Sequence, residues 1–339
     1  PVTDVRDFGV NMNDGADDTA AFQAALDQGG IVTVPPGLAI LTSTLTVQPG
    51  TWLIGSGMAS SELRWSGTAS SGGLSGGSMA LSGLWLRAMT PLASSAISCT
   101  NGPFHASGIT ISVGRWQRGA YIENCTNSFI SNIKFNGDSN TVAAIHYSGN
   151  CADAVMEDIH VQKTPAGKGL LVTGNLHNLA AHRVTIINND YSVYIDPGNI
   201  ASNICFYDLD TQGVRGSLWL RNVVDSTFYS AYLALGDWNS SLYEGAVTID
   251  GNSGNLLFSG IRIQSNYNLQ DTDRGILIKQ CDGAEFIATD IRSVKWGFIA
   301  ESAATNITVD GINFYDDVSS KYTLRSGSDV TVIPYQQLQ

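Results

Sequence analysis

The chain has 339 residues, only 14% of them charged, and a formal net charge of −12. This acidic balance disfavours nucleic acid as a partner, because contact with phosphates requires a basic surface. No apolar run reaches the roughly 18 residues of a membrane-spanning helix, so we expect no membrane insertion. The 36 glycines, together with abundant Ser, Asn and Thr, are typical of a β protein rich in turns.

The N-terminal segment VRDFGVNMNDGADDTAAFQAAL predicts a turn followed by a short helix. Asp14-Gly15 favours the turn, and Asp17 or Asp18 can cap the helix. The apolar residues of the helix share one face, which can cover the open end of a core; they are Phe22, Ala25 and Leu26. In an alternative interpretation the polar side chains form a metal loop, but the distal Glu of an EF-hand is missing. The candidate ligands would be Asp7, Asn11, Asn13, Asp14 and Asp17.

A local pattern recurs along the chain at intervals of 21 to 30 residues. Most copies begin with Asn or Asp, as in NSFISNIKF from Asn127 and NICFYDLDT from Asn203, and place an apolar residue six positions on. These apolar residues are Leu84, Ile109, Ile133, Ile159, Val184, Leu209, Tyr232, Ile261, Ile291 and Ile312. Cys99, Cys125 and Cys151 also repeat, 26 residues apart. The regular interval indicates stacking of the cysteines rather than disulfide bridging.

A second short strand follows most copies, usually after a glycine, as in GLLVTGN from Gly169 and GAVTIDGN from Gly245. Short strands with even turn spacing indicate β structure, and one unit per about 25 residues indicates a solenoid. We predict a single-stranded, right-handed parallel β-helix of about ten rungs with an N-terminal capping α-helix. A β-sandwich is the alternative, but its strands would not keep one interval over so many copies. Residues 1–37 are expected to form the cap, and residues 38–339 one continuous β-helix domain.

The N-terminal segment, with GGIVTVPPG (Gly29–Gly37) after it, resembles the entry of the pectate-lyase-like β-helix superfamily. That superfamily includes polysaccharide lyases, polygalacturonase-type hydrolases, uronan epimerases and bacteriophage tailspike depolymerases. The resemblance implies this fold and a polysaccharide substrate, but one fold hosts many reactions. The chain looks most like a tailspike or capsule depolymerase, which implies a homotrimer and a virion or secreted location.

Outward positions on the repeated strand gather polar residues into one predicted patch. With coils about 4.8 Å apart, residues of successive coils meet there; they are Asp158, His160, Arg183, Asp208 and Asp210. Asp208 and Asp210 would lie about 6.5–7 Å apart on a straight strand, and Asp158 about 9–10 Å from Asp208, two coils away. Inverting glycosidases hold their carboxyl groups about 6.5–9.5 Å apart, so these aspartates are candidate acid/base residues.

Two other classes of function stay open. A lyase or epimerase acting on a uronic-acid polymer needs a base and a cation, which His160 or Arg183 can supply. The segment YIDPGN (Tyr194–Asn199) faintly resembles the Asp-Pro motif of uronan epimerases, but no His follows its Pro. A non-catalytic glycan-binding adhesin is the other class. We expect neither a metal nor another cofactor.

Two long turns, GDWNSSLYEG and SNYNLQDTDRG, lie on neighbouring coils. Long loops beside a rigid scaffold often carry binding residues. Their carboxylates form a second candidate catalytic pair, and their aromatic rings can stack on sugars. These residues are Glu244 and Asp237, and Trp238, Tyr243 and Tyr267. Alternatively, the turns pack against a neighbouring subunit.

Nine of the 18 Lys and Arg residues lie on this predicted face or its turns, which favours an acidic polysaccharide. The basic residues predicted to bind substrate are His160, Arg183, Arg215, Arg262 and Arg292. Together these features predict a depolymerase that hydrolyses glycosidic bonds of a bacterial capsule, exopolysaccharide or O-antigen.

Overall fold

The computed structural model describes residues 2–66, 71–112, 116–137, 141–235, 244–265, 273–315 and 318–333, with the backbone alone at 163–165. Strands account for 71% of the chain and form a parallel β-solenoid of about 12 turns, somewhat more than the ten predicted. The chain divides into two compact units, residues 1–167 and 168–339. Among the described residues, no helix is long and apolar enough to cross a membrane.

The first unit begins with β1 (Val2–Asp4), the 3-10 helix η1 (Val5–Phe8), α1 (Thr19–Leu26) and β2 (Ile31–Val34). The predicted apolar face of α1 is buried, as Phe22, Ala25 and Leu26 are each 0% exposed. The role of this helix as a cap of the coil stays a prediction.

The acidic residues before α1 bind backbone groups. Asp14 accepts a hydrogen bond from the Ala16 N–H at 2.8 Å, and Asp17 accepts one from the Thr19 N–H at 3.0 Å. Asp18 accepts bonds from Asn11 at 3.1 Å and Ile40 at 3.3 Å. These carboxylates therefore organise the turn and the start of the helix.

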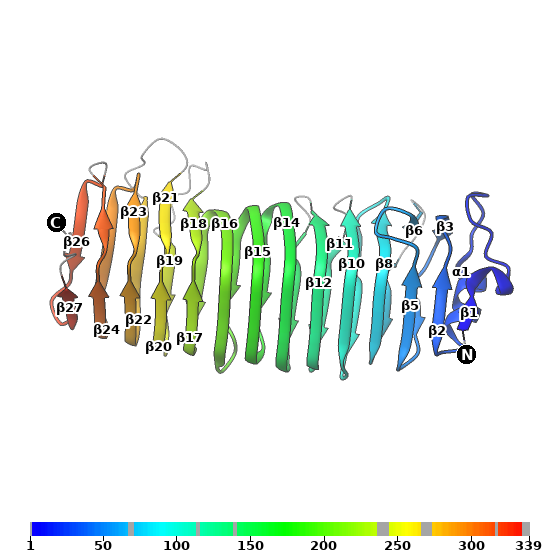
Figure 1. The fold of residues 1–339 in the computed structure, drawn as a ribbon, viewed down its shortest axis with the longest axis horizontal. Coiled ribbons are helices and arrows are strands. Elements are labelled where there is room, and N and C mark those ends of the chain that lie inside the picture. The colour runs from blue at the N-terminus through cyan, green and yellow to red at the C-terminus, as the bar shows by residue number, and fades with distance from the viewer. Residues whose placement is uncertain are drawn as a thin grey trace. The chain divides into compact units, whose positions relative to one another are not determined.

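The remaining strands of the first unit pair in parallel, one coil after the next (Figure 1). Their register aligns Leu84 with Ile109, Ile133 and Ile159, all buried as the repeat predicts. The strands are β3 (Gly37–Leu41), β4 (Leu45–Val47), β5 (Thr51–Gly55), β6 (Ser61–Trp65), β7 (Leu74–Gly76), β8 (Met79–Ala88), β9 (Leu92–Thr100), β10 (Phe104–Ser112), β11 (Trp116–Glu123), β12 (Thr126–Asn136), β13 (Ala143–Ser148) and β14 (Asn150–Val172).

The second unit repeats this arrangement, and its register corrects two predictions. Ile291 is buried but pairs with Ile263, so the position aligned with Ile261 belongs to Thr289, which is 0% exposed. Asp210 pairs with Tyr232, so the inward position of that coil belongs to Ala231, which is 3% exposed, and Tyr232 faces outward. The strands are β15 (Asn175–Ile195), β16 (Ala201–Arg221), β17 (Val223–Tyr229), β18 (Tyr232–Leu235), β19 (Gly245–Asp250), β20 (Gly254–Ser259), β21 (Arg262–Ser265), β22 (Arg274–Ile287), β23 (Asp290–Arg292), β24 (Trp296–Asp310), β25 (Asn313–Phe314), β26 (Ser320–Leu324) and β27 (Val330–Ile333).

Left-handed residues make the bends of each coil. The Asn or Asp that begins a sequence copy has a positive φ at Asn127, Asp153, Asn178, Asn203, Asn255 and Asn306. Five residues on, a second bend is left-handed at Asp158 (φ 54°), Arg183 (φ 51°) and Asp208 (φ 57°). Asn and Asp adopt this conformation more easily than most residues, because their short side chains bond locally. The sequence repeat is therefore a repeat of bends as well as of core positions.

Asn203 provides a test of this interpretation. Its Nδ2 donates to Asn178 Oδ1 at 2.8 Å, which links two coils. Asn203→Ala and Asn203→Gly both remove this bond, but only Ala keeps a side chain that disfavours φ 55°. We expect the Ala variant to be less stable than the Gly variant by about 1–2 kcal/mol, measured by urea unfolding. Equal stability of the two variants would contradict the role of left-handed strain.

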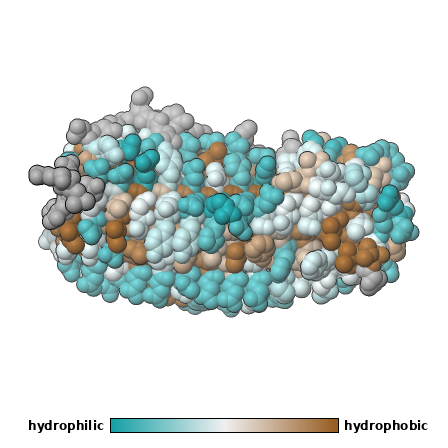
Figure 2. Space-filling model, viewed as in Figure 1, coloured by the Kyte–Doolittle hydropathy of each residue, from teal (hydrophilic) through white to brown (hydrophobic). Residues whose placement is uncertain are grey.

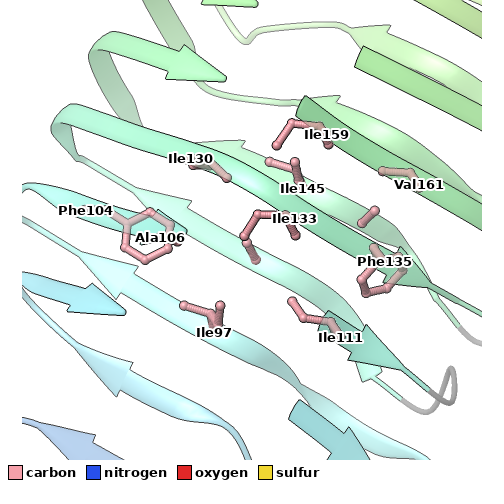
Figure 3. Close-up of a pocket in the computed structure, with 12 residues that line it drawn as sticks. Ile97, Phe104, Ala106, Ile111, Ile130, Ile133, Phe135, Ile145, Ile159 and Val161 are labelled. Carbon is pink, nitrogen blue, oxygen red and sulfur yellow. The ribbon is translucent and has the colours of Figure 1, made fainter. Parts of the chain in front are cut away.

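The interior of each unit is a set of stacked side chains. In the first unit Cys125 Sγ lies 3.8 Å from Cys99 Sγ, and the cysteines are free, as the stacking prediction implies. The pocket in Figure 3 is lined by apolar side chains and belongs to the core. In the second unit Phe206, Phe228, Phe258 and Phe286 form a ladder with centroid distances of 5.6, 4.8 and 4.7 Å.

Figure 2 shows hydrophobic patches on the surface of the N-terminal coils. The first unit exposes several large apolar side chains, including Trp52 (57% exposed) and Phe129 (36%). Trp52 and Phe129 line one mainly apolar pocket together with His105. Acid/base chemistry needs converging polar groups, so the candidate catalytic site is sought elsewhere.

Candidate active site

The predicted pair Asp208 and Asp210 flanks a bend. Both residues are exposed and Leu209 between them is buried, as alternation predicts. However, the chain turns at Asp208, where φ is 57°. The separation predicted for a straight strand therefore does not apply to this pair.

The predicted patch draws its residues from both units. In the first unit Asp158 is an exposed bend residue, and His160 pairs in register with Lys134. In the second unit Arg183 is also an exposed bend residue. For Asp158, Arg183 and Asp208, a left-handed bend explains the position without any role in catalysis.

A different set of charged residues converges in the second unit, beside the second strand of each coil. Asp190 is only 7% exposed and is held by two cations. Its Oδ2 lies 3.2 Å from Lys168 Nζ, and its Oδ1 lies 2.9 Å from Arg215 Nε. A buried carboxylate is costly unless it is paired, so these two ion pairs allow Asp190 to occupy this position.

Glu244 belongs to the same cluster. It is partly buried, and its Oε2 is a buried atom with no hydrogen-bond partner among the described residues. Burial raises the pKa of Glu244. The charge of Asp190 raises this pKa further, whereas Lys279 and Lys168 lower it. Glu244 is therefore a carboxyl group that tends to keep its proton.

Register places these two carboxylates two coils apart. Tyr191 pairs with Gly216. Leu218 pairs with Val247, so the same register, counted two residues back, aligns Gly216 with Gly245. The residues before them are Asp190, Arg215 and Glu244, so Arg215 lies on the coil between the two acids. With coils about 4.8 Å apart, the Cα atoms of Asp190 and Glu244 are about 9–10 Å apart.

Aromatic rings line the strands beside this cluster. Tyr194 and Trp219 are stacked, with ring centroids 5.6 Å apart and planes 8° from parallel. Tyr191 meets both rings edge-on. Lys279 Nζ lies 4.7 Å from the Trp219 ring centroid, and Lys168 Nζ lies 5.5 Å from that of Tyr194. The site thus combines paired charges with an aromatic surface.

The sequence prediction named Arg215 and Glu244 as site residues and counted Lys168 among the cations of the predicted face, but it missed Asp190. A signal for the site exists: a charged residue precedes the glycine that opens several second strands, at Lys168, Arg215, Glu244 and Arg274. Asp190 does not fit this pattern, because the residue after it is Tyr191 instead of a glycine.

The other predicted residues divide into two groups. Asp237, Trp238, Tyr243 and Tyr267 lie outside the described residues. Arg262 and Arg292 lie on a neighbouring face of the second unit, where Arg262 pairs with Tyr232 and Asp290, and the Arg292 guanidinium lies 4.2 Å from the Tyr315 ring centroid. Within the described part of the chain, no group of three His, Cys, Asp or Glu side chains is placed to hold a metal ion.

The parallel coils and the flanking bends define a pectate-lyase-like β-helix protein. The chain belongs to the rhamnogalacturonase A/epimerase, pectate lyase-like family, whose model matches residues 2–215. A search of curated proteins finds no significant match.

Solved structures share the fold at low identity. A DFA-IIIase from Arthrobacter chlorophenolicus has a TM-score of 0.70 at 9% identity, covering 97% of this chain and 99% of that one. The catalytic domain of a GH87 α-1,3-glucanase has a TM-score of 0.65 at 11% identity, with 98% and 68% covered. A tailspike protein of Escherichia coli bacteriophage HK620 has a TM-score of 0.63 at 12% identity, with 97% and 80% covered. At these identities the likeness establishes the fold alone.

Proposed function

We propose that the protein hydrolyses glycosidic bonds of a bacterial surface polysaccharide, with Glu244 as general acid and Asp190 as the second carboxylate. The observation that carries this proposal is the contrast between the two acids. Burial raises the pKa of Glu244, whereas two ion pairs surround Asp190. Two carboxyl groups in contrasting environments are the arrangement that acid/base cleavage of a glycoside requires.

In this mechanism Glu244 donates its proton to the glycosidic oxygen as the bond breaks. Asp190 receives a proton from the attacking water, and Lys168 and Arg215 orient its carboxylate. The Cα atoms of the two residues lie two coils apart, about 9–10 Å. Inversion is part of the proposal, and it requires the two carboxyl groups to stand about 6.5–9.5 Å apart with a water molecule between them. Tyr194 is partly exposed beside the cluster, and the exposed part of its ring, which is stacked on Trp219, can add apolar contact with the sugar.

The comparisons support the class of substrate. The family description names a rhamnogalacturonase, and structurally similar proteins include a glucanase and a phage tailspike. A capsule, exopolysaccharide or O-antigen would place the protein on a virion or outside a cell. A homotrimer is part of the same proposal, and light scattering of the purified protein tests it.

Product analysis tests the reaction. The protein is incubated with a panel of purified capsules and O-antigens, and products are examined by mass spectrometry. Hydrolysis adds one water per cleaved bond and leaves no ultraviolet-absorbing double bond. Unsaturated products would show a lyase, and binding without new reducing ends would show an adhesin; either result overturns the proposal.

The pH dependence of kcat/KM for cleavage is expected to follow the titration of Glu244. A general acid works only while protonated, so kcat/KM falls as pH rises through the folded pKa of this group. Burial has raised that pKa, and the positive charge of Lys279 lowers it. Lys279→Gln should therefore move the alkaline limb to higher pH. A limb that stays in place, or moves to lower pH, would contradict Glu244 as the acid.

The same cleavage assay distinguishes the Glu244 cluster from the aspartates that the sequence predicted. The prediction that Asp208 and Asp210 form the acid/base pair stays untested. If Asp210→Asn abolishes cleavage while Glu244→Gln remains active, the catalytic site is at the bend.

A further inference from the structure

We propose that a second face of the same unit carries a separate binding groove for an uncharged stretch of glycan, distinct from the Glu244 cluster. The groove has a volume of about 390 Å³ and is lined by Ser230, Ala231, Tyr232, Gly260, Ile261, Arg262, Ala288 and Asp290. That its ligand is a glycan rests on the proposed function.

Small residues at the second bend form the floor of this groove. The bend positions of three successive coils are Ser230 (φ 52°), Gly260 (φ 64°) and Ala288 (φ 48°). Earlier coils of this unit carry Arg183 and Asp208 at this position. A Cβ atom built on Gly260 meets no other atom within 4 Å, so the space above this bend is open.

Polar side chains two residues beyond the bend form the wall. Tyr232, Arg262 and Asp290 are in register on three successive coils, about 4.8 Å apart. Asp210 is in register with Tyr232 on the coil before them. The spacing presents a phenol, a guanidinium and two carboxylates in a row.

Tyr232 is the centre of this row. Burial raises its pKa, as does the charge of Asp210, whereas a hydrogen bond with Gln264 and the charges of Arg262 and Arg292 lower it. Asp210 and Arg262 are in register with Tyr232 on the two neighbouring coils. Its hydroxyl stays protonated at neutral pH and can both donate and accept a hydrogen bond.

The composition of the wall indicates the ligand. Arg262 and Asp290 are the two charged residues that line the groove, and their charges balance, so a dense polyanion gains little here. Carboxylates and guanidinium groups bind paired donors and acceptors in bidentate fashion, which suits the neighbouring hydroxyls of a sugar ring. A tyrosine ring adds apolar contact. Asp210 and Arg215 are five residues apart on β16, at most about 17 Å, so one polymer can reach both faces.

Filling the floor tests the groove without removing any wall residue. Gly260→Asn and Ala288→Asn place a side chain in open space, and Asn accepts the left-handed bend, as it does at Asn132 (φ 48°) in the first unit. The matched control is Gly108→Asn. Gly108 has φ 61° at the same bend of the first unit, has only ordinary contacts, and does not line the groove.

Binding is measured by affinity electrophoresis in gels that contain dextran, galactomannan or α-1,3-glucan oligosaccharides, with polygalacturonate as the anionic comparison. At least one neutral probe is expected to retard the protein, with little effect of added salt. The double variant should bind that probe at least ten-fold more weakly, with an unchanged melting temperature. Gly108→Asn should bind as the unaltered protein does.

Three results would overturn the groove: no retardation by any neutral probe, retardation by polygalacturonate alone, or full binding by the double variant. Cleavage is scored separately. Loss of binding in the double variant of a protein that cleaves nothing would support the groove and count against the hydrolase. Full binding by the double variant, with cleavage abolished in Glu244→Gln, would support the hydrolase and count against the groove.

Discussion

Replacing Glu244 with Gln is expected to lower kcat/KM for cleavage by about 10²–10⁴-fold, the usual contribution of a general acid. Gln has nearly the same shape but no acidic proton to donate. The substitution also leaves the ion pairs of Asp190 with Lys168 and Arg215 in place. Initial rates of reducing-end release from the cleaved polysaccharide give the measurement.

Two variants serve as comparisons for this result. Glu285→Gln removes an exposed carboxylate of the same unit and is expected to keep full activity. Asp190→Asn removes the second carboxylate and is expected to reduce cleavage strongly as well. A Glu244→Gln protein that retains more than half of the activity would exclude Glu244 as the acid.

The same substitution has a predictable effect on stability. The folded state raises the pKa of Glu244 above its value in the unfolded chain. A group of this kind contributes stability below its unfolded pKa, and that contribution is lost as pH rises through the folded pKa. Gln does not titrate, so the Glu244→Gln variant does not lose this stability as pH rises. The free energy of unfolding of the variant should therefore rise relative to that of the unaltered protein as pH increases from the unfolded pKa, about 4.3, through the raised folded pKa.

Replacing Phe258 with Ala is expected to destabilise the second unit by about 3–5 kcal/mol, since a buried ring is lost and a cavity remains. Phe258 is 0% exposed and stacks between Phe228 and Phe286, with planes 8° and 5° from parallel. Its removal interrupts the ladder on both sides. Urea unfolding followed by circular dichroism measures the loss.

Phe258→Leu is the matched variant, because it keeps most of the apolar volume and should cost clearly less. Tyr229→Ala is the surface control: Tyr229 also stacks, at 5.3 Å from Tyr207, but it is partly exposed. A Phe258→Ala protein that loses less than about 1 kcal/mol would show that the neighbouring rings close the gap.

Family and fold class were predictable from the sequence because both depend on local preferences that recur. Each coil needs left-handed bends, and Asn or Asp at those bends leaves a visible interval in the chain, as at Asn178 and Asn203. Inward positions need apolar residues, which is why Leu84, Ile109 and Ile133 align. The predicted number of turns, about ten, fell short of the roughly 12 found, because the repeat was recognised only from Leu84 on, whereas β2 and β5 already stack in register before β8.

The candidate site depended on information that the sequence pattern does not carry. Alternation along a strand identified Asp208 and Asp210 as outward, but it took no account of the bend at Asp208. The cluster of Asp190, Lys168 and Glu244 joins positions up to 76 residues apart. Its chemistry comes from burial and from pairing across coils, which depend on the register.

The amino-acid order by itself determined that this protein coils into parallel rungs, because each rung repeats the same short-range demands on bends and core. Only the tertiary structure decided which charged residues meet. Tyr232 and Ala231 exchange their expected faces through a register shift of one residue. Burial and pairing then gave Glu244 and Asp190 their contrasting environments, because desolvation and ion pairing exist only once the coils are stacked.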